Sequence, residues 1–266
     1  MVVTTVLLER PHAKCVSEIL TIADLSSAPE FLVNWFFSHR DVHWLGAFVN
    51  TTLVGTGMLT VLGKTAWLGN IAVLPAWRGR GLGHRLTDEL TTLALESGVE
   101  VVLLIATADG EPLYRSLDFE VTDTYTEWLL PAPEVNLHPS MGAMASTAPD
   151  LMLDRWSIGE DRRRLWEALP STQGWAWHDA NGLAAFWHPT LLHHGLIVSR
   201  TVSALMTILD RQQGAWVIRD GLGLTDWCVR RGARAGEHTS RMAWRGMDPL
   251  RHAGGISAGL ISYACG

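Results

Sequence analysis

The stretch that most constrains the fold is residues 69–93, where an apolar segment, a proline, a glycine-rich loop and a leucine repeat follow one another. The apolar segment ends at Leu74-Pro75, because proline lacks the N–H that a central strand needs and favours an extended residue before it. Glycine follows at Gly79, Gly81 and Gly83, and leucine then recurs at the spacing of one helix face, at Leu82, Leu86, Leu90 and Leu93. The pattern predicts a buried strand, a tight loop and an amphipathic helix.

A glycine-rich loop that opens a helix is an arrangement suited to anions. Its backbone N–H groups carry no bulky side chains and point to the place where the positive end of the helix dipole also points. Arg78 and Arg80 add positive charge on either side of Gly79. We therefore predict that the loop binds a phosphate or diphosphate; a plain strand-to-helix turn without a ligand is the alternative.

Two common phosphate-binding signatures do not fit this loop. It lacks the Lys-Ser/Thr pair of a P-loop, which disfavours magnesium-nucleotide chemistry. It is not Gly-x-Gly-x-x-Gly either, and no acidic residue follows a strand at the ribose-binding distance, which disfavours a dinucleotide-binding fold.

The loop resembles instead the Arg-x-x-Gly-x-Gly signature of the GNAT N-acetyltransferase superfamily, with Arg78, Gly81 and Gly83 at the signature positions. Two flanking elements are also similar to that family, namely Val73-x-Pro75 upstream and Leu113-Tyr114 with Leu117-x-Phe119 downstream. Asp118 departs from the family pattern, which often has glycine before the phenylalanine. The resemblance covers roughly the first half of the chain.

The resemblance implies transfer of an acyl group, usually acetyl, from coenzyme A to an amine. The diphosphate of acetyl-CoA is expected at the loop, on Arg78, Gly79, Arg80, Gly81, Leu82, Gly83 and His84. The pantetheine arm is expected to pair with the strand edge formed by Ile71, Ala72 and Val73, where a backbone N–H can face the thioester carbonyl. A fixed donor of this kind stabilises a developing oxyanion by several kcal/mol.

Two proton transfers remain in such a reaction. An alkyl amine with a pKa of ~10.4 loses a proton at a cost of roughly 4–5 kcal/mol at pH 7. Tyr114 matches the family's general acid for the departing thiolate, a transfer from a pKa of ~10 to ~8.5 that costs about 2 kcal/mol; a half-buried core tyrosine is the alternative. The base is left open among His43, Asp41, Glu127, Asn70 acting through a water, and ordered water alone.

Segments with strand and helix patterns alternate around the loop. Strands are expected over 4–8, 43–49, 53–62, 67–74, 99–105 and 119–130, and helices over 27–39, from 82 onward, and at Tyr114; residues 10–14 are expected to form a turn. This order predicts an α/β (α+β layered) unit in which helices flank a mixed, mostly antiparallel sheet.

The second half of the chain repeats this order. It predicts a helix over 162–169, a hairpin around Asn181-Gly182, a strand over 194–199, a helix over 201–212, a strand over 215–218, a helix over 225–231 and a closing strand over 238–244. The segment Ser199-Arg200-Thr201 replaces the glycine-rich loop, so this copy is expected to have lost cofactor binding. We predict tandem GNAT-like domains: a catalytic domain over 1–131, a linker over 132–150 and a degenerate domain over 151–266.

Composition excludes several other classes of protein. A formal net charge of −6 argues against general nucleic-acid binding and is compatible with a cationic substrate. The 3 cysteines are scattered, and neither they nor the histidines, His193-His194 included, have the spacing of a metal site. The absence of a long apolar run and of a basic leader predicts a cytoplasmic protein that does not bind membranes.

The remaining side-chain clusters are expected to be structural. Arg162-Arg163-Arg164 is expected to be a solvated helix face, and most of the 13 tryptophans are expected in the core. The candidates for contact with substrate are Trp44, Trp67, Trp175 and Trp177.

The function that these features favour is an acetyl-CoA-dependent N-acetyltransferase for the primary amine of a small molecule, with the second half shaping or covering the acceptor pocket. One alternative is a non-catalytic acyl-CoA-binding sensor or interaction protein, motivated by the absence of an obvious base. Another is a protein lysine or N-terminal acetyltransferase. The acyl-chain length and a homodimer are left open.

Overall fold

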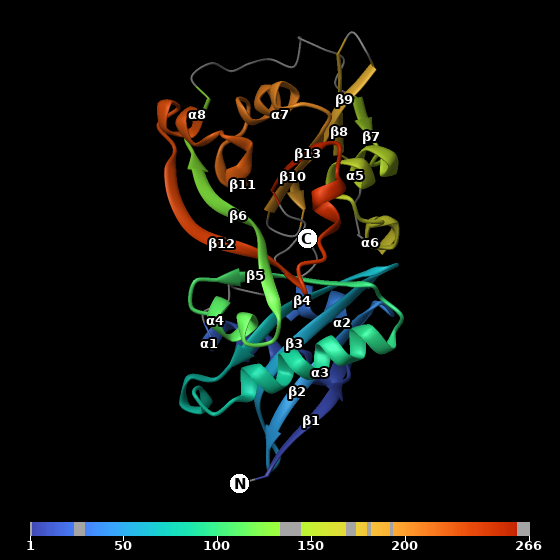
Figure 1. The fold of residues 1–266 in the computed structure, drawn as a ribbon, viewed down its shortest axis with the longest axis vertical. Helices are drawn as coiled ribbons and strands as arrows, with labels where there is room; N and C mark the ends of the chain where they lie inside the picture. The colour runs from blue at the N-terminus through green and yellow to red at the C-terminus, as the bar shows by residue number, and fades with distance from the viewer. Residues whose placement is uncertain are drawn as a thin grey trace. The chain divides into compact units, whose positions relative to one another are not determined.

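The computed structural model describes residues 2–23, 30–133, 145–168, 174–179, 182–191 and 194–259 (Figure 1). The chain divides into two compact units. Unit 1 contains residues 1–120 and 242–247, and unit 2 contains residues 121–241 and 248–262. These units are defined by contacts, whereas the domains predicted from the sequence are parts that would fold independently. The predicted domain boundaries therefore stay a prediction.

Unit 1 is a sheet with the strand order β1-β2-β3-β4-β5. Neighbouring strands are antiparallel except β4 and β5, which are parallel. The strands are β1 Val3–Leu8, β2 Val42–Val49, β3 Thr52–Leu62, β4 Thr65–Val73 and β5 Val101–Thr107, and β6 Phe119–Leu130 begins in this unit. The helices are η1 Arg10–His12, α1 Ala13–Ile22, α2 Glu30–Phe37, η2 Pro75–Trp77, α3 Leu82–Glu96 and α4 Glu111–Arg115.

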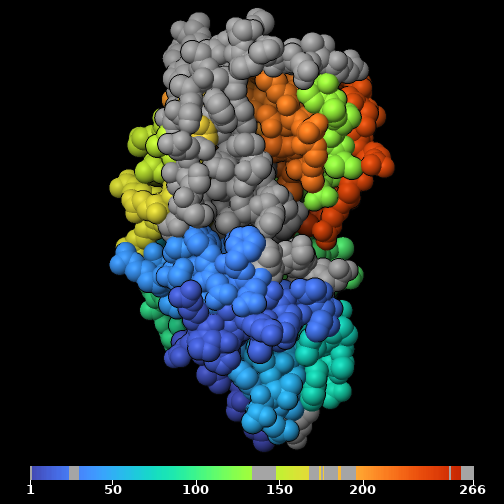
Figure 2. All heavy atoms as spheres, turned by 180° about the vertical axis from the view of Figure 1, so that it is seen from behind, coloured from blue at the N-terminus to red at the C-terminus, as the bar shows by residue number. Residues whose placement is uncertain are grey.

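Helix α3 packs on the sheet through its leucine stripe. A Cβ at Gly57 of β3 would lie 2.7 Å from Leu90 Cδ1, so the missing side chain is what lets this helix approach the strand. Leu86 and Leu90 are both fully buried. Helices α1 and α2 cover the other face of the sheet, which Figure 2 shows in blue.

Unit 2 has the strand order β12-β6-β11-β13-β10-β9-β8-β7. Its strands, besides β6, are β7 Ala145–Thr147, β8 Gly174–Asp179, β9 Gly182–Leu191, β10 His194–Ser199, β11 Gly214–Arg219, β12 Arg234–Trp244 and β13 Ile256–Gly259. Its helices are α5 Leu151–Ile158, α6 Arg163–Ala168, α7 Val202–Leu209, η3 Asp220–Leu222, α8 Thr225–Arg230 and η4 Pro249–His252. The apolar core lies between α7, α8 and the sheet and includes Leu205, Trp216 and Cys228.

The two units repeat one order of elements. In unit 1, helices α1 and α2 precede the hairpin β2–β3, and β4, α3, β5, α4 and β6 follow. In unit 2, α5 and α6 precede β8–β9, and β10, α7, β11, α8 and β12 follow. The internal repeat expected from the sequence is therefore present, and β10 is the counterpart of β4.

Several local expectations are corrected. The segment expected to turn at residues 10–14 forms η1 and the start of α1. Helices α1 and α5 and strand β13 were not expected from the sequence. Part of the expected linker is strand β7, and residues 134–144 lie outside the described ranges. Asn181, at the expected hairpin turn, also lies outside them.

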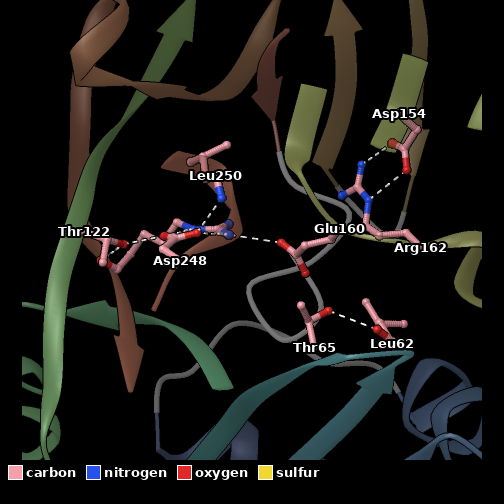
Figure 3. A network of polar contacts seen from close by, with 9 residues as sticks. Leu62, Thr65, Thr122, Asp154, Glu160, Arg162, Asp248 and Leu250 are labelled. Carbon is pink, nitrogen blue, oxygen red and sulfur yellow. Dashed lines mark hydrogen bonds and ion pairs between the residues drawn. The ribbon is translucent and has the colours of Figure 1, made fainter. Parts of the chain in front are cut away.

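Several charged side chains of unit 2 are buried, and Figure 3 shows the polar contacts among them. Arg162 is only 1% exposed and donates to both carboxylate oxygens of Asp154, so the expectation of a solvated side chain is wrong for this arginine. Its neighbours Arg163 and Arg164 are exposed. A second buried group joins Arg241 to Asp248 and Glu160. Buried charges are retained when they are paired in this way.

Candidate functional site

The loop before α3 presents a row of unused backbone N–H groups. Arg78 N–H donates to Pro75 O, and Arg85 N–H donates to Gly81 O. Between them, the backbone N–H groups of residues 79–84 donate to no acceptor among the described residues. Those of residues 82–84 belong to the first turn of α3, which has no helical acceptor for them. Residues 79–81 and His84 are exposed, whereas Leu82 is buried and Gly83 is half-buried, so the row of donors begins at the surface.

The N-terminus of α3 is left free of any competing group. Its N-cap is Gly81, at φ 77°, with no side-chain cap and no acidic residue in the first turn. Gly79 also has a positive φ, 73°, which residues with a Cβ adopt at a cost of about 1–2 kcal/mol. The expected anion site therefore has the backbone geometry that its glycines predicted.

Gly83 serves packing rather than backbone conformation. A Cβ at this position would lie 3.0 Å from Leu113 Cδ1 of α4. The first turn of α3 and the helix that carries Tyr114 are therefore in close contact. Leu82 is buried beside Val54 and Val49, whereas His84 is exposed.

Strands β4 and β5 pair over only part of their length. Their parallel register runs from Thr65 opposite Val101 to Leu68 opposite Leu104, and neither the rest of β4 nor the rest of β5 takes part. On its other side, β4 carries a bulge against β3 between Gly69 and Ala72, and Asn70 in this bulge has φ 52°. The bulge begins next to Leu68, where the pairing of β4 with β5 ends.

The free edge of β4 presents main-chain groups of Val73. Leu74 N–H donates to Val54 O across the β3–β4 pair. Because main-chain groups alternate sides along a regular strand, the N–H of Val73 points away from β3 toward the gap, while Ile71 lies in the bulge itself. Ala72 lies opposite Thr56, pairs with β3 and is buried.

Arg78 is held against this edge by its guanidinium. Its Nε donates to Val73 O at 3.1 Å, and its Nη2 donates to Ala23 O, at the end of α1, at 3.1 Å. Arg80 is exposed and stacks over Trp77, with its Cζ 4.9 Å from the ring centre. Arg80 Nη2 also donates to a backbone oxygen, that of Ala76, at 3.4 Å. Arg80 therefore makes one long backbone bond, whereas Arg78 makes two shorter ones.

A comparison with protein families identifies this part of the chain. Residues 15–119 match the model of the acetyltransferase (GNAT) family. The chain carries a GNAT acetyltransferase domain. Members of this family use acetyl-CoA, which agrees with a loop of free amides next to an open strand edge.

Two curated relatives match a limited part of the chain. An uncharacterised protein of Mycobacterium leprae is 42% identical over 84 residues, 29% of this chain and 23% of that protein. The N-alpha-acetyltransferase RimI of Mycobacterium tuberculosis is 38% identical over 85 residues, 29% of this chain and 52% of that protein. The matched part of the GNAT domain thus spans about a quarter of the first relative and about half of the second.

A solved structure resembles the whole chain in fold. The crystal structure of a proposed acetyltransferase from Pyrococcus horikoshii has a TM-score of 0.69 and 17% identity, covering 99% of this chain and 96% of that one. Identity this low shows a shared fold alone. The fold class expected from the sequence, a mostly antiparallel sheet flanked by helices, is confirmed.

Tyr114 of the GNAT domain is available as a proton donor. It lies on α4, half-buried, with its ring edge toward Phe119 at 6.2 Å between centres. Burial raises the pKa of Tyr114 to about 12, and its hydroxyl makes no hydrogen bond to another described residue. A phenol in this state stays protonated at any physiological pH.

The predicted base candidates are not gathered at the β4 edge. His43 lies on β2, opposite Leu59, whose partner on β4 is Leu68, where the gap begins. Glu127 belongs to unit 2, and Asp41 lies before β2. Asn70 is the candidate on β4 itself, and its Nδ2 points to Met58 Sδ at 3.7 Å.

Two of the tryptophans considered for substrate contact are core residues. Trp44 and Trp67 are 1% and 0% exposed. Trp175 and Trp177 lie on β8, and their side chains fall outside the described part of the structure, as does His193. Among the described residues no cluster of potential metal ligands is found, and no described helix has the length and apolar character needed to cross a bilayer.

Proposed function

We propose that the GNAT domain transfers the acetyl group of acetyl-CoA to the primary amine of a small molecule. The observation that carries this proposal is the pairing of two features in one unit, a row of free amides at the uncapped start of α3 and a strand edge that faces a gap. A diphosphate fits the first and an extended chain of amides fits the second.

Acetyl-CoA, when bound, supplies a thioester whose acyl carbon is open to attack by an amine nitrogen and whose sulfur leaves as a thiolate. The amides of residues 79–84 hold the diphosphate, with the charge of Arg80 beside them. The main chain of Ile71 and Val73 holds the amide arm, and the N–H of Val73 offers a fixed donor to the acyl oxygen as it gains negative charge. Such a donor lowers the activation free energy by roughly 3–4 kcal/mol.

Tyr114 supplies the proton that the sulfur needs. Because the pKa of Tyr114 is raised to about 12, the phenol still carries its proton when the C–S bond breaks. Complete transfer to a thiolate of ordinary pKa costs about 5 kcal/mol, so the proton moves as the bond to sulfur breaks and not before.

The amine must shed a proton as well. His43 lies on β2, with β3 between it and β4, whereas Asn70 lies on β4 next to Ile71. We infer that a water held by Asn70 and the backbone of β4 receives this proton and passes it to solvent.

A second acceptor class is favoured by a specific observation. The relative from M. tuberculosis carries the name of an N-alpha-acetyltransferase, which acts on the amine at a protein's N-terminus. The same donor site serves such an acceptor, since a protein N-terminus is also a primary amine, with a lower pKa of ~7.7–8.0.

The two acceptor classes are separated by one assay. The purified protein is incubated with acetyl-CoA and either a panel of small amines or peptides with free N-termini, and thiol release is followed. Release with small amines is expected. Thiol release with peptides and with none of the small amines would show that the acceptor is a protein N-terminus. Acetyl-CoA binding without release in either panel identifies a non-catalytic acyl-CoA-binding protein and ends the proposal.

A further inference from the structure

In unit 2, a strand of the chain itself closes the edge that corresponds to the free edge of β4. By the order of the repeat, β10 corresponds to β4 and β11 to β5. Strand β13 pairs antiparallel with β10, from Leu196 opposite Gly259 to Ser199 opposite Ile256. It also meets β11, with Ala258 opposite Ile218. Strand β13 therefore lies between two strands whose counterparts in unit 1 separate beyond Leu68.

The entry of β13 is fixed by a tight glycine pair. Gly254 N–H and Gly255 N–H both donate to Trp156 O of α5, at 3.0 and 3.1 Å. A Cβ at Gly255 would lie 2.5 Å from Ser157 Oγ and 2.9 Å from Ser157 Cα, so no larger residue fits without moving the backbone. Ser199 Oγ lies 3.4 Å from Ile256 O and 3.2 Å from Thr201 O, so its proton is shared between these two acceptors. The start of β13 is therefore held by α5, through Trp156 O, and paired with the end of β10.

The helix end in unit 2 that corresponds to the diphosphate site is closed as well. Helix α7 has Thr201 at its N-cap, and Thr201 Oγ1 accepts the N–H of Ala204 at 3.1 Å. Its counterpart α3 has Gly81 at the N-cap and no side-chain cap. The turn from β10 to α7 offers Ser199, Arg200 and Thr201 in place of glycines, so it cannot form the same row of free amides.

We propose that β13 takes the place of an acyl-CoA arm in unit 2, so that the chain binds one acyl-CoA, in unit 1 only. A pantetheine arm carries amide groups that pair with a strand edge, and β13 offers the same groups from a backbone with small, buried side chains at Ser257 and Ala258. Closing the edge internally completes the sheet of unit 2 without a ligand, and it removes a free strand edge that would otherwise be open to other chains. This inference rests on the proposed function of unit 1.

The first test counts bound ligand. The full chain is saturated with acetyl-CoA and weighed by native mass spectrometry, and one acetyl-CoA per chain is expected. Two per chain overturns the inference. None per chain refutes the proposed function instead, and the second test, which needs no ligand, still examines β13.

The second test measures amide hydrogen exchange in the ligand-free protein. The amides of β10 that face β13 are expected to exchange at least tenfold more slowly than those of Ile71 and Val73. Acetyl-CoA is expected to slow exchange at Ile71 and Val73 and to leave β10 unchanged. Equal exchange at the two edges without ligand, or slowing at β10 by acetyl-CoA, contradicts the inference.

A glycine variant links the protection of β10 to β13. Gly255→Ala is expected to speed exchange along β10 at least tenfold, because the added methyl collides with Ser157. Gly221→Ala is the matched control in the same unit, since its Cβ would meet nothing closer than Asp123 Oδ1 at 3.7 Å and its φ is not positive. Protection of β10 that is equal in the two variants, or a second acetyl-CoA bound by the unaltered protein, overturns the inference.

Discussion

At the scale of single residues, the hydroxyl of Tyr114 separates a catalytic role from a packing role. Tyr114→Phe keeps the ring that faces Phe119 and removes the proton donor. We expect kcat to fall by roughly 10²-fold or more, the usual contribution of a general acid, while the Kd of acetyl-CoA changes little. The measurement is steady-state kinetics together with calorimetric titration of acetyl-CoA.

Another buried tyrosine provides the control for this variant. Tyr125, on β6, is also buried, and burial raises its pKa too, but it belongs to unit 2. Tyr125→Phe is expected to leave the step at sulfur unaffected. An unchanged kcat in Tyr114→Phe assigns Tyr114 to the packing of α4. Since the pKa of Tyr114 is about 12, no loss of kcat from its ionisation is expected below about pH 11.

Arg78 is predicted to position the β4 edge rather than to bind phosphate. Its two bonds reach Val73 O and Ala23 O, and each such bond is worth about 0.5–1.5 kcal/mol. Arg78→Met is therefore expected to slow transfer from acetyl-CoA and from acetyl-pantetheine, which has no phosphates, by similar factors. Steady-state rates with the two donors make the comparison.

Arg80 is the matched comparison for Arg78. It is exposed, and its guanidinium stacks on Trp77 next to the same loop. Arg80→Met is expected to slow transfer from acetyl-CoA and to leave the rate with acetyl-pantetheine unchanged. If Arg78→Met also affects acetyl-CoA alone, Arg78 contacts phosphate as the sequence first indicated, and the positioning role is wrong.

At the scale of elements, the N-terminus of α3 is predicted to be the chief anchor of acetyl-CoA. Gly81 and Gly98 stand just outside the two ends of this helix, with φ of 77° and 82°, and a Cβ at either would meet no atom within 4 Å. Alanine at either position costs about 1–2 kcal/mol of backbone strain. Only Gly81→Ala alters the row of amides that faces the ligand.

The two glycine variants should therefore match in stability and differ in binding. Both are expected to lower the melting temperature by similar amounts, and Gly81→Ala alone is expected to raise the Kd of acetyl-CoA, by tenfold or more. Thermal unfolding and calorimetric titration provide the two readouts. An equal Kd of acetyl-CoA in both variants would show that the diphosphate does not bind at the start of α3.

Sequence patterns predicted the elements whose signals are local. The leucine repeat of α3 and the proline that ends β4 specify their elements within a few residues, because helix periodicity and proline geometry need no distant partner. The loop glycines likewise predicted a tight turn, and in the structure Gly79 and Gly81 have positive φ.

Features that depend on distant contacts could not be predicted in this way. Strand β13 is short and flanked by glycines, and its strand character comes from pairing with β10, more than fifty residues earlier. Arg162 belongs to a basic run that suggests a solvent-exposed surface, and only the fold brings Asp154 within reach of it. The separation of β4 from β5 is likewise a property of the sheet, although Asn70 in a run of apolar residues was a signal for a bulge.

At the scale of the whole molecule, a buried charge network joins distant parts of the chain within unit 2. Arg241 of β12 donates to both carboxylate oxygens of Asp248, at 2.7 and 2.9 Å, and to Glu160 at 3.0 Å (Figure 3). Thr122 of β6 and the N–H of Leu250 also donate to Asp248. Removing one member leaves a buried charge without its partner, which costs about 3–5 kcal/mol.

This network makes the stability of the protein depend on acid in a predictable direction. Burial alone raises the pKa of Asp248, but the bonds from Arg241 and Thr122 outweigh it and hold that pKa below its ordinary value. A carboxyl whose pKa is lower in the folded state than in the unfolded chain stabilises the fold above the unfolded pKa of about 3.9. That contribution is lost progressively as the pH falls below this value and through the folded pKa.

We therefore expect Asp248→Asn to reduce the free energy of unfolding by about 3–5 kcal/mol at pH 7 and to flatten its decline below pH 4. Urea unfolding at several pH values between 7 and 3 measures both effects. Thr122→Val removes one hydrogen bond to the carboxylate and should reduce the free energy of unfolding in the same direction by a smaller amount. Asp226→Asn, at an exposed position, is the control and should change neither the free energy of unfolding nor its decline with acid appreciably. If the parent protein and Asp248→Asn decline in parallel below pH 4, the acid sensitivity of this fold arises from other carboxylates.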